Sequence, residues 1–184
     1  MIDTWQYWFH RTFHVNKWLY RTFHSWHHRL YVPYAFGALY NHPFEGFLLD
    51  TLGAIIARYL ANMSTRQDVL LFTFATFKTV DDHCGYSLPF DPLQFLFSNN
   101  AGYHDIHHQA IGIKKNFAQP FFIHWDTIMG TRMTRKDVAD AQAKRAQPTP
   151  SANGAANANG TANGHTNGHT NGHRKPTCEK EKVQ

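Results

Sequence analysis

The sequence predicts a mainly α, membrane-associated helical domain followed by a disordered C-terminal tail. Aromatic and histidine residues recur three and four positions apart over residues 4–31, a stretch without Gly or Pro. Phe, Trp and Tyr make up 15% of the chain, a content typical of proteins at a membrane interface. The end of the chain consists mostly of Ala, Asn, Gly and Thr, which cannot form a core. We therefore assign residues 1–136 to the domain and residues 137–184 to the tail.

The first predicted element is one helix, or two helices in succession, over residues 4–31. Positions three and four apart share a helix face, so the spacing groups its aromatic and histidine side chains. Val32-Pro33 ends the element, because the residue before a proline is disfavoured in the helical conformation.

Two apolar segments follow, at residues 46–60 and 69–80. Both are shorter than the ~20 apolar residues that a membrane-spanning helix needs. We expect them to form a helical hairpin or a re-entrant structure packed against other spans. The turn between them is predicted at residues 62–65, with Ser64 or Thr65 capping the second helix.

The remainder of the domain begins with a loop that contains Pro89, Asp91 and Pro92. A short helix is predicted next, and it carries a second group of histidines. The aromatic segment over residues 116–130 then ends at Gly130-Thr131, where charged residues take over.

Charge favours a membrane partner over a nucleic acid. The formal net charge is +5, and four basic residues alternate with aromatic ones near the start: Arg11, Lys17, Arg21 and Arg29. An anionic membrane surface attracts such a segment at ~1 kcal/mol per charge. Because no nucleic-acid-binding motif accompanies these residues, we expect them to face a membrane.

Cysteine content and the N-terminal residues bear on the cellular compartment. Cys84 and Cys178 lie far apart in the sequence, which excludes a disulfide framework and fits a reducing, cytosol-facing location. Met1 leads directly into polar and aromatic residues, so no signal peptide is predicted.

Histidine is the most informative residue type in this sequence. The chain has 14 histidines, and eight of them form three groups with helical spacing: His10 and His14; His24, His27 and His28; His104, His107 and His108. Residues three and four apart share a helix face, so each group can direct two or three imidazoles to one point. Neutral imidazole is a common metal ligand and suits iron, zinc and copper. The groups therefore predict a metal site.

The number of histidines predicts two metal ions. A tetrahedral zinc site takes four ligands, and a mononuclear iron triad takes two histidines and one carboxylate. The eight grouped histidines exceed either need, and His83 and His42 are further candidate ligands. The full prediction is a mainly α, membrane-associated helical domain with a histidine-lined di-metal centre.

The other histidines and the nearby acids receive different roles. His124 lies outside the groups and is expected to pack or to face solvent. The histidines of the tail are expected to be unliganded: His165, His169 and His173. Asp81 and Asp82 are predicted to accept a hydrogen bond from the far nitrogen of a histidine ligand, which would fix its tautomer. Asp105 should point away from the ligand face.

The sequence resembles the fatty acid hydroxylase and sterol desaturase superfamily over nearly all of residues 3–133. The resemblance is carried by the string from Asp3 to Trp8 that leads into His10-Arg11-x-x-His14, by His24-x-x-His27-His28 and by His104-x-x-His107-His108. Within the superfamily it most resembles the sphinganine 4-hydroxylases, through residues 32–43 (VPYAFGALYNHP), 79–85 (TVDDHCG) and 103–109 (YHDIHHQ).

This resemblance implies a monooxygenase of sphingolipid biosynthesis in the endoplasmic reticulum membrane, with its metal site facing the cytosol. It implies two non-haem iron ions, dioxygen as co-substrate, and electrons from NAD(P)H through cytochrome b5 or a similar carrier. The implied reaction is hydroxylation of a sphingoid base or a dihydroceramide at carbon 4, giving a phytosphingosine-type product. Hydroxylation of an unactivated methylene group requires a redox metal, which no side chain replaces.

Alternatives remain open. A sterol or fatty-acyl oxidase or desaturase of the same superfamily would share the histidine groups. A zinc hydrolase is disfavoured, because no His-Glu-x-x-His motif is present. Members of the superfamily carry membrane-spanning helices ahead of the first histidine pair, which begins here at His10. We therefore expect part of a larger protein, or a truncated and inactive remnant.

Overall fold

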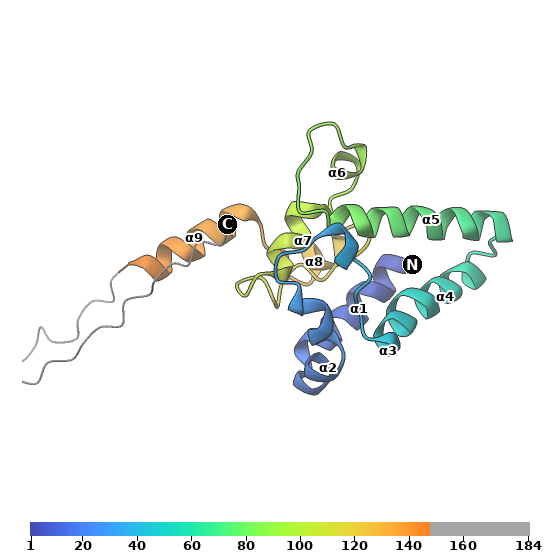
Figure 1. Cartoon of the computed structure of the whole chain (residues 1–184), viewed down its shortest axis with the longest axis horizontal. Helices are drawn as coiled ribbons and strands as arrows, with labels where there is room; N and C mark the ends of the chain where they lie inside the picture. The colour runs from blue at the N-terminus through green and yellow to red at the C-terminus, as the bar shows by residue number, and fades with distance from the viewer. Residues whose placement is uncertain (148–184) are drawn as a thin grey trace, which may run out of the picture. The chain divides into compact units, whose positions relative to one another are not determined.

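The computed structural model describes residues 1–147, and this part is mainly helical, as predicted. No strand occurs within residues 1–147. Figure 1 shows helices α1 to α9, joined by turns and by a long irregular segment between α7 and α8.

The first thirty residues form two helices in succession, one of the two expected arrangements, followed by a tight turn. Helix α1 spans Ile2–Val15, helix α2 spans Lys17–Thr22, and a 3₁₀ turn spans His24–Arg29. The break falls at Asn16, which has an extended conformation and accepts hydrogen bonds from the first backbone N–H groups of α2. An asparagine that caps a helix in this way starts a new one, so the chain changes direction here.

The two apolar segments form the predicted helical hairpin. Helix α3 (Pro43–Gly46), a π-helical turn (Phe47–Leu52) and helix α4 (Gly53–Leu60) make the first arm, and helix α5 (Thr65–Asp82) makes the second. Ser64 caps α5 in a capping box with Gln67, so the predicted turn and cap are confirmed. Among the described helices, none combines the length and the apolar character that crossing a bilayer requires.

Helix α1 packs along the first arm of this hairpin. Trp5 Nε1 donates to the carbonyl of Leu48 at 3.0 Å, and Gln6 Nε2 donates to the carbonyl of Leu49 at 3.1 Å. The Trp5 ring lies on Gly53, where a Cβ atom would stand 2.4 Å from the indole Cδ1. Glycine therefore allows the close approach of α1 and α4.

Three short helices complete the domain: α6 (Pro92–Leu96), α7 (Ala101–His108) and α8 (His124–Ile128). Asn100 caps α7 by accepting from the backbone N–H of Tyr103. The irregular segment between α7 and α8 is held by buried Asp126, which accepts from the backbone N–H groups of Phe117 and Ala118 and from the Tyr103 hydroxyl. Phe117 and Ala118 of this segment pack against Tyr7 of α1 in the buried core.

The domain extends further than the sequence predicted. Helix α9 spans Arg135–Ala146, so residues 137–146 are helical although they were assigned to the disordered tail. Thr134 and Asp137 form a capping box, and the helix is rich in Ala, Lys and Arg, which favour helix. The tail histidines and Cys178 lie outside the described residues.

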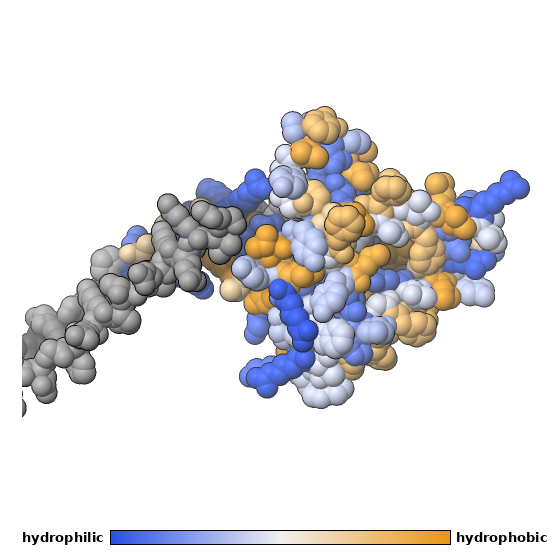
Figure 2. Space-filling view, in the orientation of Figure 1, coloured by the Kyte–Doolittle hydropathy of each residue, from blue (hydrophilic) through white to orange (hydrophobic). Residues whose placement is uncertain are grey.

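Apolar side chains gather on the outside of the domain. In Figure 2, hydrophobic residues cover much of the visible face around the hairpin. Large apolar side chains that are more than two-thirds exposed lie in several elements, and they include Phe36, Tyr59, Leu60, Leu70, Phe77 and Phe95. The described part of the chain therefore carries an extensive exposed apolar surface.

Candidate metal centre

Four segments, well separated in the sequence, bring nine histidines together. Helix α1, the 3₁₀ turn, the C-terminal end of α5 and helix α7 supply them, and every one of these side chains is at least nine-tenths buried. They form two groups. The first consists of His10, His14, His24, His28 and His107, and the second consists of His27, His83, His104 and His108.

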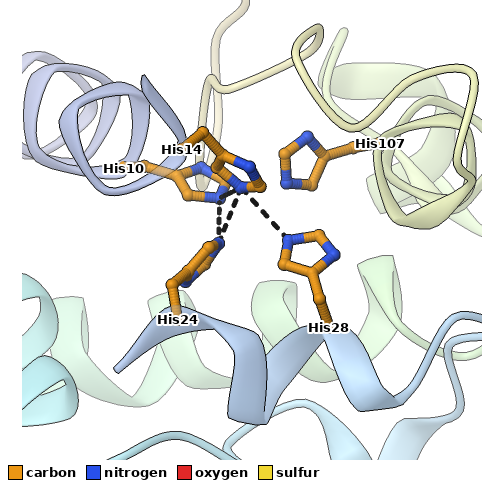
Figure 3. A group of neighbouring side chains, drawn as sticks. All are labelled: His10, His14, His24, His28 and His107. Atoms are coloured by element: carbon orange, nitrogen blue, oxygen red, sulfur yellow. Dashed lines mark hydrogen bonds between the residues drawn. The ribbon is translucent and has the colours of Figure 1, made fainter. Parts of the chain in front are cut away.

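In the first group, the Nε2 atoms converge on a common centre. Figure 3 shows His10 and His14 on one side, His24 and His28 opposite them, and His107 entering from α7. The Nε2 atoms of His14 and His24 lie 2.7 Å apart, and those of His10 and His24 lie 3.1 Å apart. The His28 and His14 Nε2 atoms are separated by 3.1 Å.

The second group has the same construction. The Nε2 atom of His104 lies 3.0 Å from that of His83 and 3.0 Å from that of His108. The His83 and His27 Nε2 atoms lie 3.2 Å apart. Within each group, one potential ligand atom from every histidine falls within 4.8 Å of all the others.

Backbone carbonyls fix the tautomers of four of these histidines. The Nδ1 atoms of His10, His107, His83 and His108 lie 2.6–2.9 Å from the carbonyls of Phe117, Lys115, Thr79 and Leu30, respectively. A carbonyl only accepts, so each Nδ1 must carry the proton and, in the neutral ring, Nε2 presents a lone pair. All four Nε2 atoms point into their group.

These lone pairs suit a cation between them. In the second group His83 and His108 both present bare Nε2 atoms to His104, which has one Nε2 proton at most and cannot satisfy both. In the first group the buried Nε2 of His107 has no hydrogen-bond partner within the described residues. Facing lone pairs repel one another, whereas a metal ion binds them all.

The spacing also fits a metal ion. Metal–imidazole bonds are about 2.0–2.1 Å long, so nitrogen ligands around one ion lie roughly 3 Å apart. The Nε2–Nε2 separations of 2.7–3.2 Å match this. The residues present therefore fit one metal ion in each group.

Burial keeps the histidines in the neutral form that binds metal. Desolvation lowers the pKa of all nine, to about 4 for His10 and His83 and to about 3 for His108. For most of them the neighbouring imidazoles lower the pKa further. Near neutral pH the rings are therefore deprotonated and available to a metal.

One functional residue was missed by sequence reasoning. Glu45 of α3 is 2% exposed, and its Oε1 contacts the Nδ1 of His24. Burial, together with the carboxylate of Asp50, raises the pKa of Glu45 to about 8. A nearby bound cation would favour the ionised carboxylate, which accepts the His24 Nδ1 proton and turns the Nε2 lone pair to the centre. The one feature of the sequence that could have indicated this role is that Glu45 is an acidic residue within an aromatic segment.

His42 was a candidate ligand, but the structure places it in neither group. Its Nδ1 accepts from the backbone N–H of Phe44 and caps α3, and its ring packs against Phe23 and Trp26. The prediction is wrong because the His-Pro sequence starts a helix at this point. His83, the other candidate, lies within the second group.

The predicted roles of Asp81 and Asp82 are also wrong. Asp82 is buried against the Lys78 ammonium and accepts from Asn99 Nδ2, and Asp81 accepts from Gln94 Nε2. Because both stand at the end of α5 on the side of these partners, neither bonds to a histidine of the described chain. Backbone carbonyls and Glu45 hold the histidines instead.

The other two side-chain predictions agree with the structure. Asp105 lies outside both groups and accepts from Gln109 Nε2. His124 is exposed at the start of α8 and also lies outside the groups.

A small cavity lies between the two groups. It measures about 30 Å³ and is lined by His10 and His24 of the first group and by His27 and His83 of the second. A second cavity of about 80 Å³ shares five lining residues with it and continues between α1 and the hairpin. The shared residues are Gln6, Leu39, Asp50, Thr79 and Gln119.

Comparison with known proteins identifies the family that this chain resembles. The sequence profile of the fatty acid hydroxylase family matches residues 1–131. The sphingolipid C4-hydroxylase of Saccharomyces cerevisiae is 61% identical over 148 residues, which is 80% of this chain and 42% of the relative. Sphinganine C4-monooxygenase 2 of Arabidopsis thaliana is 59% identical over 131 residues, or 71% of this chain and 51% of the relative.

A third relative carries a different name. A very-long-chain aldehyde decarbonylase of Oryza sativa is 58% identical over 133 residues, which is 72% of this chain and 52% of the relative. The chain thus spans about half the length of the curated relatives that it matches. No solved structure matches it.

Proposed function

The chain belongs to the fatty acid hydroxylase family, and from this premise we propose that it hydroxylates a long-chain sphingoid base or a dihydroceramide at carbon 4. The product is a phytosphingosine-type trihydroxy base. Support for the substrate comes from relatives named sphingolipid C4-hydroxylase and sphinganine C4-monooxygenase at 57–61% identity.

The observation that carries this proposal is the pair of histidine groups whose Nε2 lone pairs converge. We propose that each group holds one iron ion and that the two ions work together as a di-iron centre. When bound, such a centre supplies the redox chemistry with dioxygen that insertion of oxygen into a C–H bond requires, and zinc has no redox chemistry to offer.

The protein's own residues position and protect this chemistry. Backbone carbonyls and Glu45 hold the imidazoles in the ligating tautomer, and their burial keeps bulk water from the centre. The cavity of about 30 Å³ between the groups is lined by histidines of both, so a substrate atom placed there would lie next to each group. The second cavity, of about 80 Å³, has a largely apolar lining between α1 and the hairpin, which suits part of a hydrocarbon chain.

Membrane association and electron supply are part of the same proposal. We propose that the exposed apolar side chains face the endoplasmic reticulum membrane and that the metal centre faces the cytosol. The Arg11 and Arg29 guanidinium groups lie over the Trp8 and Trp26 rings, a pairing of charge and aromatic surface that suits a lipid headgroup layer. Electrons reach the centre from NAD(P)H through cytochrome b5 or a similar carrier.

The test is expression of the chain in a yeast host that lacks its own sphingoid-base 4-hydroxylase. We expect trihydroxy bases to reappear in the long-chain base fraction, measured by mass spectrometry. The His107→Ala variant should yield none, because it removes a ligand of the first group, whereas the exposed His124→Ala variant should match the parent. Wild-type yield from His107→Ala would overturn the site, and absence of trihydroxy bases from a membrane-bound, iron-loaded parent would overturn the function.

Metal analysis gives a second, independent test. Two iron ions per chain are expected after mild purification, one from each histidine group. A single zinc ion per chain would overturn the di-iron assignment, because zinc cannot exchange electrons.

A second candidate reaction is oxidation of a fatty-acyl, aldehyde or sterol substrate. The observation that favours it is the similarity to the rice protein named as an aldehyde decarbonylase. The same lipid analysis decides between the two: hydrocarbons or oxidised sterols in place of trihydroxy bases would support the second reaction.

A further inference from the structure

We propose that Asp50 binds the ammonium group of a free long-chain base and makes the site selective for the cationic amine over its N-acylated form. The inference rests on the proposed function and names the substrate class that its site prefers. The carrying observation is a small carboxylate-lined cavity that touches both histidine groups and shares five lining residues with a mostly apolar cavity.

Two carboxyl groups face this cavity. Asp50 lines both cavities and keeps exposed surface, so a ligand can reach it. Gln6 Nε2 donates to its Oδ1 at 3.0 Å, and no described residue bonds to Oδ2. Gln6 therefore sets the orientation of the Asp50 side chain, while the second oxygen, Oδ2, stays available to a ligand.

Glu45 provides the independent observation. Its side chain is 2% exposed and lines the same cavity. One oxygen contacts His24, and the other, Oε2, is buried without a hydrogen-bond partner. A buried carboxyl oxygen that lacks a partner costs free energy unless a donor fills the space beside it.

The charge of the cavity selects the class of ligand. Neither cavity is lined by a Lys or Arg side chain. The polar lining near the histidines adds Gln6, Asn41 and Gln119, which can bond to hydroxyl groups. An ammonium group with neighbouring hydroxyl groups matches the charge and the hydrogen-bonding groups of this lining, and an anionic headgroup does not.

The local backbone explains how Glu45 and Asp50 reach the same cavity. Asp50 lies in the π-helical turn Phe47–Leu52, which connects α3 to α4. A π turn bonds residues five apart, so it brings positions i and i+5 closer to one face than an α-helix does. Such turns often occur at functional sites.

The reaction chemistry places the amino group beside the metal centre. In a sphingoid base the amine is on carbon 2 and oxygen enters at carbon 4, so with ordinary bond lengths the nitrogen lies only about 3–4 Å from the reacting carbon. The amino end must therefore bind in the cavity that touches both histidine groups. The hydrocarbon chain would then leave in the direction of the second cavity, which is lined by Ala54, Leu71, Phe72 and Ala75.

N-acylation removes the feature that Asp50 would recognise. An amide is neutral at every physiological pH, so it forms no ion pair with the carboxylate, and it adds an acyl group beside a narrow cavity. Hydrogen bonds that involve a charged group are the strong ones, and replacing a charged partner by a neutral one weakens binding about ten- to a hundred-fold.

The experiment uses a photoreactive, clickable sphinganine and its N-acetylated analogue, with the full chain in membranes. Asp50→Asn keeps an acceptor for Gln6 and removes the charge. We expect it to reduce labelling by the cationic probe about ten-fold or more while labelling by the neutral analogue stays unchanged. Asp50→Glu should restore part of the labelling, and Asp140→Asn on exposed α9 serves as the matched control.

Labelling does not depend on turnover, so this result is separate from that of the hydroxylation assay. Equal labelling of the parent and Asp50→Asn by the cationic probe would overturn the proposal. Equal loss with both probes would also overturn it, because a structural role lowers binding of either lipid. If Asp50→Asn selectively loses labelling by the cationic probe while the parent chain produces no trihydroxy base, the result would support the amine site and overturn the proposed reaction.

Discussion

At the scale of single residues, the Nδ1 contacts decide what the histidines can do. Each backbone carbonyl that accepts from an Nδ1 leaves a lone pair on the opposite nitrogen, where a metal could bind, and the histidine spacing alone does not reveal this. The sequence predicted eight of the nine gathered histidines by their spacing, and His83 as an addition. It could not identify the carbonyls of Phe117 and Leu30, because backbone groups leave no signal in residue identity.

Glu45→Gln tests the one side chain that, like the backbone carbonyls, accepts from the Nδ1 of a histidine. The amide keeps the shape but cannot ionise, so it holds His24 less firmly in the ligating tautomer. We expect iron affinity to fall about 10- to 100-fold, measured by metal titration of the stripped protein. Asp140→Asn is the control, and an unchanged iron affinity in Glu45→Gln would contradict the role given to this residue.

The lowered histidine pKa values predict the pH dependence of the metal-free fold. The unfolded histidines take up protons as the pH falls below their ordinary pKa of 6.5, while folded His10 and His83 resist protonation until about pH 4. Stability is therefore greatest above pH 6.5 and is lost between pH 6.5 and 4. Thermal unfolding at a series of pH values checks this, and a melting temperature that rises on acidification would contradict it.

At the scale of elements, close packing of α1 on α4 positions His10 and His14 relative to the hairpin. Gly53→Ala would place a Cβ atom 2.4 Å from the Trp5 ring, so one helix must shift. We expect a loss of about 1–3 kcal/mol in the free energy of unfolding, measured by denaturant titration.

Gly46→Ala is the matched control in the same arm. Its added Cβ would find its nearest neighbour at 3.9 Å, which is ordinary contact. If both variants lost the same stability, loss of backbone flexibility rather than the Trp5 contact would be the cause.

The success of the sequence predictions also differs between elements. The hairpin turn and its Ser64 cap were predicted because a capping box is a local signal. Two helices in succession were one of the expected arrangements at the start of the chain, but the position of the break at Asn16 was not predicted. The helical start of the supposed tail was missed, because its Thr134 cap lies in a polar stretch whose composition resembles that of loops. The prediction that His42 is a metal ligand failed because of a local contact: His42 caps α3 and lies in neither histidine group.

At the scale of the whole molecule, positive charge and exposed apolar side chains together predict binding to anionic membranes. The net charge is +5, and each basic residue near the surface adds about 1 kcal/mol of attraction. We expect the chain to float with vesicles that contain anionic lipid and to bind neutral vesicles less, with binding weakened by salt. Equal flotation with both kinds of vesicle would show that apolar contact alone drives the association.

The distribution of the ligands along the chain has a consequence for biosynthesis. Helix α7 contributes His107 to the first group and His104 and His108 to the second. Each group therefore joins α7 to segments near the start of the domain. Neither can be completed on the ribosome until α7 has left the exit tunnel. If each group binds a metal ion, as proposed, binding is delayed until almost the whole domain has been synthesised, and each ion would then cross-link segments that are distant in the chain.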